Sequence, residues 1–264
     1  MKTIIPATSF PVSLAEAKHQ LAYFHSEDDA HVQALIAIAT EEAEEYTGVN
    51  AHFCTVEEKL AQFPAGMIVL SGEPFAAINT IKYYDADNNL QTLSSSLYRV
   101  YSHLKDTQIE IIDSWPSTYD REDAIVIEYV LGYASVTTAD AETDTFTQAG
   151  HPFQNGDRVV VYGAREATIP AGITARKVYY VINRVADTFQ LSTTADGVAV
   201  TITTNGTGQW YVGIKEVPRV MQQAILMMIA GLNEFRTDEI TGTMISQVSM
   251  SSRYLLNHVK PKRL

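Results

Sequence analysis

The sequence predicts an α+β fold: a helical core with β-strands, into which a small all-β domain is inserted. Three observations lead to this expectation. Apolar residues recur at helical spacing near the start and near the end of the chain. Short β-type runs follow the first helices, and a Thr-, Gly- and Val-rich segment without helical periodicity fills residues 140–210. The helical core is expected to combine an N-terminal helical hairpin with a long C-terminal helix.

Two capped helices are expected first. Ser13 and Glu16 have the spacing of a capping box, so a helix should start there and run to about Phe24. The acidic stretch 26–29 has a second capping pattern of this kind, so a second helix should start there. The apolar residues of this helix recur every three or four positions. Gly48 closes that helix. Because about two residues join the helices, they should form a hairpin.

Short β-type runs occupy the next part of the chain, with turn residues between them. Residues 85–89 are rich in Asp and Asn and indicate a hairpin loop. The same loop resembles the start of a calcium site, but the required glycine and terminal Glu are missing, so no metal is expected there. The predicted strands are 55–60, 67–70, 78–84, 98–101, 109–112 and 124–129.

Three parts are expected along the chain. Residues 1–138 form the N-terminal part of the core, residues 139–212 an inserted all-β module, and residues 213–264 the C-terminal helix and tail. The predicted strands of the module are 158–162, 178–183, 188–192 and 198–203. Pro218 suits the first position of a helix that should run from Arg219 to about Arg236. That helix is apolar on most faces, which is typical of burial within a domain or in a subunit interface.

Charge and composition limit the function classes. The chain has 264 residues and a formal net charge of −12, which argues against nonspecific nucleic-acid binding. The single cysteine, Cys54, excludes an internal disulfide and a Cys-based zinc cluster and suggests a reducing compartment. Neither a signal peptide nor a membrane span is expected. Residues 211–264 carry seven basic and four acidic groups, and the basic end is either a solvated tail or a segment that docks on an acidic partner.

The usual catalytic signatures are absent, and no cofactor or metal is expected. The sequence holds no phosphate-binding loop, dinucleotide fingerprint, HExxH, GxSxG or CxxC. His52 and Cys54 could lie on one side of a strand, but no further ligands lie nearby. An enzyme built from dispersed carboxylates near Trp115 is the second hypothesis, although a solvated loop is the simpler interpretation. Those carboxylates are Asp113, Asp120, Glu122 and Asp123.

Several blocks in this order resemble the head-tail connector (adaptor) proteins of long-tailed bacteriophages. They are PVSLAEAKHQL, EDDAHVQALIAIATEEAEEYTG, IEYVLGY and VPRVMQQAILMMIAGLNEFR. The resemblance covers roughly residues 9–135 and 214–260. Residues 140–212 are similar to small β-modules of phage virion proteins, including the runs GHPFQNGDRVVV and DTFQLSTT. The resemblance is one of pattern, because no catalytic fingerprint contributes to it.

The resemblance implies a noncatalytic virion protein of the neck, made in the host cytoplasm before assembly. Copies would form a ring, typically a dodecamer, between the portal and a stopper or tail-completion protein, with DNA in transit through the lumen and no membrane contact. The family's C-terminal segment tends to reach the portal, which makes the candidate docking tail Tyr254, Leu255, Leu256, Lys260, Lys262 and Arg263. The candidate subunit-interface residues are Met221, Ile225, Met228, Leu232, Leu35 and Ile36.

One further alternative concerns the inserted module. The protein could be a virion decoration or carbohydrate-binding module that attaches through its helices. Trp210, Tyr211 and Tyr162 could then stack on a sugar, although aromatic residues of small β-modules more often form the core.

Overall fold

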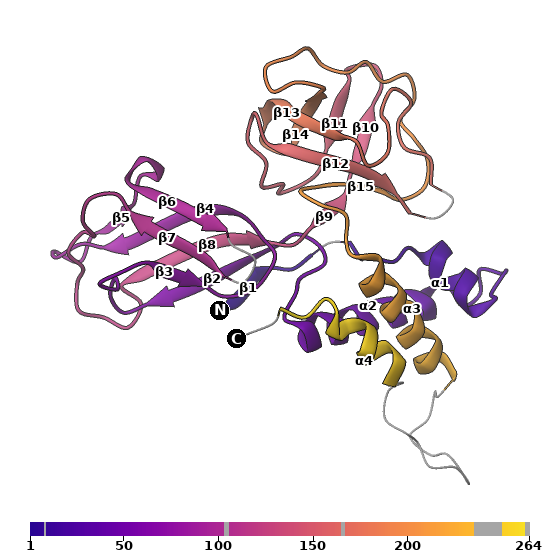
Figure 1. Cartoon of the computed structure of the whole chain (residues 1–264), viewed down its shortest axis with the longest axis horizontal. Coiled ribbons are helices and arrows are strands. Elements are labelled where there is room, and N and C mark those ends of the chain that lie inside the picture. Colours follow the sequence, from indigo (N-terminus) through magenta and orange to yellow (C-terminus); the bar gives the residue numbers. More distant parts are fainter. Residues whose placement is uncertain (8, 103–105, 165–166, 235–249, 262–264) are drawn as a thin grey trace, which may run out of the picture. The chain divides into compact units, whose positions relative to one another are not determined.

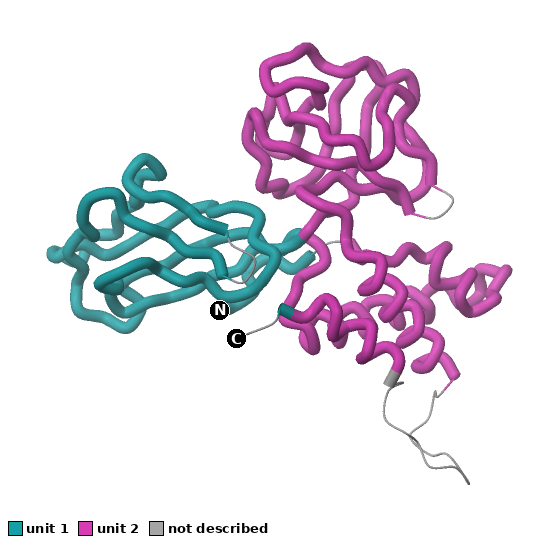
Figure 2. The backbone as a smooth tube through the Cα atoms, in the orientation of Figure 1, with its two compact units in different colours: residues 1–7, 53–132, 261–264 teal, residues 8–52, 133–260 magenta. Residues whose placement is uncertain are grey.

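The structure, a computed structural model, describes residues 1–7, 9–102, 106–164, 167–234 and 250–261. The chain divides into two compact units (Figure 2). One unit consists of residues 1–7, 53–132 and 261–264, and the other consists of residues 8–52 and 133–260. Each unit therefore combines segments that are far apart in the sequence.

The unit around residues 53–132 contains two antiparallel sheets (Figure 1). The five-stranded sheet has the order β1-β2-β8-β4-β5, and the three-stranded sheet has the order β3-β7-β6. A 3₁₀ turn, η1 (Ser95–Leu97), precedes β6. The strands are β1 (Lys2–Ile5), β2 (Cys54–Leu60), β3 (Ile68–Leu70), β4 (Phe75–Tyr84), β5 (Leu90–Thr92), β6 (Tyr98–Ser102), β7 (Thr107–Ile111) and β8 (Ile125–Leu131).

Alternating side chains of these strands form one hydrophobic core between the two sheets. Val56 of β2 pairs with Tyr129 of β8, and both side chains are fully buried. The three-stranded sheet contributes Ile68 and Ile109 to the same cluster. Because side chains alternate between the faces of a strand, the residues next to Val56 and Tyr129 point to the other face. Among them, Glu57 pairs directly with Glu128.

The second unit contains the helices α1 (Leu14–Leu21), α2 (Asp29–Thr47), α3 (Arg219–Glu234) and α4 (Met250–Asn257). The predicted capping box of α1 is confirmed: the Ser13 hydroxyl accepts from Glu16 N, and the Glu16 carboxylate accepts from Ser13 N at 2.8 Å. Helix α2 begins at Asp29 without a side-chain cap, so the second predicted capping box is wrong. Gly48 ends α2 with a φ of 70°, as predicted.

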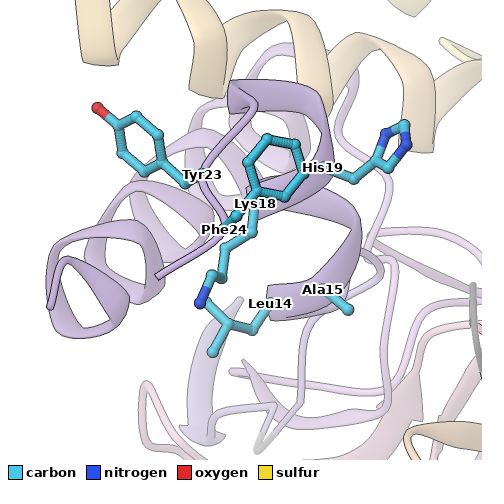
Figure 3. A pocket seen from close by; sticks show the side chains of 6 residues that line it. All are labelled: Leu14, Ala15, Lys18, His19, Tyr23 and Phe24. Atoms are coloured by element: carbon cyan, nitrogen blue, oxygen red, sulfur yellow. The ribbon is translucent and has the colours of Figure 1, made fainter. Parts of the chain in front are cut away.

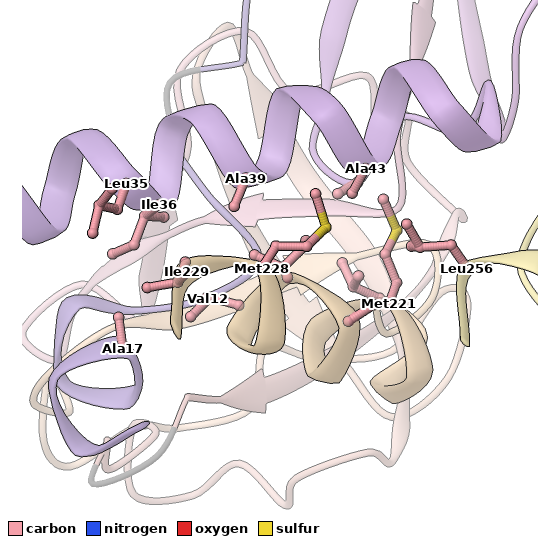
Figure 4. Close-up of a cluster of buried hydrophobic side chains, with 14 of the residues drawn as sticks. Val12, Ala17, Leu35, Ile36, Ala39, Ala43, Met221, Met228, Ile229 and Leu256 are labelled. Atoms are coloured by element: carbon pink, nitrogen blue, oxygen red, sulfur yellow. The ribbon is translucent and has the colours of Figure 1, made fainter. Parts of the chain in front are cut away.

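The helices pack around a core of their own (Figure 4). Ile36, Ala39 and Ala43 of α2 face Met221, Met228 and Ile229 of α3. Val12, Ala17 and Leu256 bring the N-terminal segment, α1 and α4 into the same cluster. Helix stability here comes mainly from this apolar face, because an isolated helix as short as α1 or α4 is marginal in water.

The remaining strands of the second unit form a small β-module. They are β9 (Ala134–Val136), β10 (Thr138–Asp140), β11 (Thr145–Thr147), β12 (Arg158–Gly163), β13 (Val178–Val185), β14 (Thr188–Ser192) and β15 (Trp210–Gly213). Their order is β10-β11-β14-β13-β12-β15-β9, all antiparallel. Only Thr137 separates β9 from β10, although the two strands lie at opposite ends of this order. The sheet therefore curves until it closes on itself as a small barrel.

The predicted fold class, a helical core with a long C-terminal helix, is wrong. In the described part of the chain, sheets of seven, five and three strands dominate, and the helices are short. The described part of the C-terminal helix ends at Glu234, and residues 235–236 lie outside the described residues. The reason is that strand pairing joins distant residues, such as Leu60 and Ile125. Periodicity identifies the longer strands but not the separate cores that the paired strands enclose.

Further differences concern strands, because the short strands β1, β5, β9, β10, β11 and β15 are not among the predicted ones. Residues 198–203, predicted as a strand, make only an isolated bridge between Ala199 and Ser192. Strand β1 was not predicted, because its four residues are too few for a pattern and its partner β2 lies 50 residues further along the chain. The predicted hairpin loop at 85–89 is confirmed, since the Asp85 side chain accepts from the backbone N–H groups of Asp87 and Asn89.

Candidate interaction surfaces

The predicted subunit-interface residues lie mainly in the helical core. Leu35, Ile36, Met221, Ile225 and Met228 are at most 6% exposed, and Leu232 is partly buried against the same cluster. The helices of this unit bring all six together. A side chain without exposed surface cannot contact a second molecule. Five of the six candidates thus offer little surface to a second molecule in this structure, whereas Leu232 keeps some exposed surface.

The predicted docking tail contains both buried and exposed residues. Tyr254 of α4 is 65% exposed, whereas Leu256 is 1% exposed and fills the helical core. Leu255 is partly buried against that core. Lys260 follows α4 and is exposed. Lys262 and Arg263 lie outside the described residues.

Tyr46, near the C-terminal end of α2, holds α4 in place. Its hydroxyl donates to Asn257 Oδ1 at 2.9 Å. The Lys260 ammonium lies 4.7 Å from the centre of its ring, and the Arg253 guanidinium lies 5.8 Å from it. Cations at such distances are attracted by the face of an aromatic ring. The exposed face of α4 thus belongs to a helix that is fixed to α2.

The turn between α1 and α2 presents the most exposed apolar side chain among the described residues. Phe24 is 88% exposed. The helix expected to reach Phe24 ends earlier, because Ala22 adopts the left-handed conformation with a φ of 56°. Beside this turn lies an open pocket of about 350 Å³ (Figure 3). The residues that line it are Leu14, Ala15, Lys18, His19, Tyr23 and Phe24.

Sequence reasoning missed Phe24 as a surface feature. The helical pattern appeared to continue through it, so it was treated as the last residue of a helix. Phe24 continues the apolar spacing of Leu14, Ala17 and Leu21, so periodicity alone gave no signal that the helix ends before it.

His52 is the most strongly perturbed histidine among the described residues. Its Nδ1 lies 2.6 Å from the Ser9 hydroxyl, and its ring lies edge-on to Tyr211 at 5.2 Å. Burial lowers the pKa of His52 to about 3, so the ring is neutral at physiological pH. The Tyr211 hydroxyl also donates to Phe10 O at 3.2 Å. This cluster joins the N-terminal segment to strand β15 of the barrel, and its role is structural.

Glu44 is the acidic group with the largest upward shift among the described carboxylates. Its Oε1 accepts from Ala51 N at 2.7 Å. Burial raises its pKa to about 6, even though this hydrogen bond lowers the value. The Glu44 carboxyl thus ionises less readily in the folded chain than in the unfolded chain, although it is still mostly ionised at neutral pH.

The aromatic residues of the barrel do not form a sugar-binding surface. Trp210, Tyr211 and Tyr162 are at most 3% exposed, and Tyr162 stacks on Tyr211 with ring centres 5.1 Å apart. The described part of the barrel, which omits residues 165–166, has no large aromatic side chain among its strongly exposed apolar residues. The alternative interpretation of these rings as core is confirmed.

The proposed carboxylate cluster near Trp115 also lacks a catalytic arrangement. The Asp123 carboxylate accepts from Arg121 Nε in an ion pair, and this pairing holds the pKa of Asp123 below its usual range. Asp113, Asp120 and Glu122 are exposed. Trp115 stacks on Phe63 at 4.6 Å and donates to Gly66 O at 3.1 Å. These contacts fit the solvated loop that was the simpler interpretation.

No metal centre or membrane span is found in the part of the chain that the structure describes. Its His, Cys, Asp and Glu side chains form no group of three or more that could hold an ion. None of its helices is long and apolar enough to cross a bilayer.

Comparison with known proteins gives a match in structure but not in sequence. No family model and no curated protein matches the chain. A chain from the neck of an empty gene transfer agent (GTA) particle, computed with C6 symmetry, matches with a TM-score of 0.56 and 12% identity, covering 100% of this chain and 96% of that one. A chain from the virion of the native particle gives the same values. A chain from the native neck, computed with C12 symmetry, has a TM-score of 0.53 and 13% identity, with 99% and 94% covered.

These matches concern the fold, because the identities are low. They extend over both units, so the barrel is included in the shared architecture.

Proposed function

We propose that this chain is a noncatalytic structural protein of the virion neck of a tailed phage or prophage. The observation that carries the proposal is the end-to-end structural match to chains of the gene transfer agent neck. The sequence blocks that resemble head-tail connectors support it independently. An enzyme is not favoured, because Asp123 is paired with Arg121 and the other carboxylates near Trp115 are exposed. A sugar-binding module is not favoured either, because the aromatic rings that could stack on a sugar are buried.

The finer proposal is a connector that forms a closed ring between the portal and a stopper or tail-completion protein. The matched neck structures were computed with C6 and C12 symmetry, and a ring of twelve copies agrees with both. DNA would pass through the lumen of such a ring. The net charge of −12 suits this role, since an acidic surface repels DNA in transit.

The exposed residues of the C-terminal segment remain our candidates for portal docking. Tyr254 supplies an exposed aromatic ring, and Lys260 supplies a positive charge. Aromatic and basic residues are common anchors of protein interfaces. Leu256 acts indirectly, because it fixes α4 in the helical core.

Native mass spectrometry tests the ring. The purified chain is measured alone and then mixed with the portal protein of the same genome. We expect a complex that contains the portal and about twelve copies of the chain. A single subunit under both conditions would contradict the connector proposal.

Two variants test portal docking separately from folding. Tyr254→Ser, which leaves the contact of Lys260 with Tyr46 in place, should weaken portal binding by about tenfold or more. The control is Arg158→Glu, which changes an exposed basic residue of the barrel and should leave binding unchanged. Deletion of the whole segment is a poorer test, because it also removes the buried Leu256.

A further inference from the structure

Phe24 projects from a turn that the rest of the chain holds firmly. Tyr23 N donates to Lys18 O at 2.9 Å, and the Tyr23 hydroxyl is hydrogen-bonded to the Asn233 side chain at the end of α3. The Lys18 ammonium pairs with Asp29 and connects α1 to the start of α2. A fixed turn presents Phe24 without the entropy cost of ordering a flexible loop. Among the described residues of the unit none covers its ring, since Phe24 is 88% exposed.

The surroundings of Phe24 are acidic and partly apolar. The Phe24 surface consists of Phe24, the exposed Glu27 and the adjoining pocket along α1 (Figure 3). Asp28 lies next to Glu27, and its carboxylate is 3.8 Å from His25 Nε2. Lys18, the basic side chain of this region, is already paired with Asp29. A partner of this surface should therefore present positive charge together with apolar side chains.

The opposite end of α3 presents that combination. The α3-start surface consists of Phe10, Lys215, Arg219 and Val220, of which Phe10 and Val220 are each 37% exposed. Gln222 donates to Pro11 O at 3.1 Å, which places the segment of Phe10 beside the first turn of α3. Glu216 is largely neutralised by Arg176, at 2.7 and 2.9 Å. The Arg219 Nε also lies 3.6 Å from Glu216 Oε1, but its side chain remains 72% exposed and can face a second charged partner.

The two surfaces lie too far apart to meet within one chain. Tyr23 contacts Asn233 at the end of α3, whereas Arg219 begins that helix. At ~1.5 Å of rise per residue, the two ends of α3 are separated by about 20 Å. A cyclic ring uses heterologous contacts, in which one surface of a subunit meets a different surface of the next. Complementary surfaces at opposite ends of one helical unit satisfy that requirement.

We propose that the Phe24 surface of one subunit binds the α3-start surface of a second copy of this chain. Phe24 packs against Phe10 and Val220 of the neighbour, and Glu27 faces its Arg219. This inference rests on the proposed ring and adds the residues that close it. The core residues Met221 and Ile225 act only by holding α3 in place.

The first test compares two apolar residues of equal exposure. Phe24→Ser changes the proposed anchor, and Val198→Ser changes a barrel residue that is 87% exposed. Each full-length variant is mixed with the portal protein and measured by native mass spectrometry, with circular dichroism as a check of folding. Phe24→Ser should raise the concentration needed for half-assembly by about tenfold or more, and Val198→Ser should leave it unchanged.

A charge exchange tests the pairing of the two surfaces. Glu27→Arg and Arg219→Glu should each weaken assembly, because each places like charges opposite one another. The double variant should recover much of the loss. If both single variants assemble equally poorly and the double variant assembles no better, the proposed pairing of Glu27 with Arg219 is overturned.

The outcomes separate this inference from the function on which it rests. If the unmodified chain forms no ring, the ring itself is contradicted. If the unmodified chain and Phe24→Ser assemble equally well, the ring stands and the Phe24 surface is not its interface.

Discussion

His52 shows how one buried side chain couples the stability of the fold to pH. Its pKa falls from 6.5 in the unfolded chain to about 3 in the folded chain, because burial penalises the charged ring. The folded state thus binds a proton less readily than the unfolded state. The contribution of the neutral ring is fully present above pH 6.5 and is lost as the pH falls toward 3.

We predict that His52→Asn reduces the loss of stability in acid. Asn keeps an acceptor for the Ser9 hydroxyl but does not titrate. Between pH 6.5 and 4.5 the unmodified chain should lose up to about 1.4 kcal/mol per pH unit more than the variant. Urea unfolding at several pH values measures this difference. Parallel curves for the two proteins would show that His52 does not carry the effect.

Glu44 should make the stability of the fold depend on pH in the opposite direction from His52. Its pKa rises from 4.5 to about 6 on folding, so the buried carboxylate destabilises the fold above pH 6 and does so less as the pH falls toward 4.5. Glu44→Gln keeps an acceptor for Ala51 N and removes the charge. We expect the variant to be more stable than the unmodified chain by about 1 kcal/mol at pH 8 and similar to it at pH 4.5. Glu45→Gln, on the exposed side of α2, is the matched control and should show no such pH dependence.

At the scale of elements, α4 depends on its contacts with the other helices. Eight residues form a marginal helix in isolation, so its order derives from Leu256 in the core and from Tyr46. Tyr46→Leu removes both the hydrogen bond to Asn257 and the ring beneath Lys260. Hydrogen exchange of residues 250–257 should then become about tenfold faster or more. Tyr254→Leu changes an exposed ring on the same helix and should leave the exchange rate unchanged.

Local signals explain which elements could be predicted. The Ser13 cap and the Gly48 end depend on contacts within a few residues, and both are present as expected. The positions of the longer strands, such as β4, β8 and β13, were also predicted from alternation, but their partners were not. Residues 198–203 have the composition of a strand and yet make only one bridge, because pairing depends on a neighbour that the local sequence does not specify.

For the candidate interface, too, the local sequence does not specify which neighbour covers a given face. The apolar residues of α3 were chosen as interface candidates because they cover most faces of the helix. Met221 and Ile225 turned out to be fully buried, because α2 and α4 cover those faces within the same chain. Sequence could not distinguish a face covered by its own chain from one covered by a neighbour. Phe24 is the converse case: the expected helix included it, and its exposure is set by the left-handed Ala22 that ends α1.

At the scale of the whole molecule, the chain forms separate hydrophobic cores, and this predicts which part can fold alone. The barrel has its own aromatic core: Phe189 lies 5.8 Å from Phe146 and 5.3 Å from Phe153. Its sheet closes because β9 pairs with β15 while β10, one residue later, pairs with β11. Closure leaves no free edge of the sheet between these strands. The barrel thus has the two features that an independent small domain needs.

We therefore predict that a fragment of residues 133–216 folds alone, with a cooperative thermal transition seen by circular dichroism. This fragment keeps β9 and β10, the two strands that close the barrel, and the hydrogen bond from Ile214 N to Tyr133 O. It loses only a few contacts, such as the hydrogen bond from the Tyr211 hydroxyl to Phe10 O. The matched fragment is 139–212, the boundary expected from sequence, which lacks β9, the first residue of β10 and the last residue of β15. Without β9 the edge of β15 is unpaired and the barrel is open, so this fragment should unfold at a lower temperature or fail to fold. Equal stability of the two fragments would mean that closure by β9 is not what holds the barrel together.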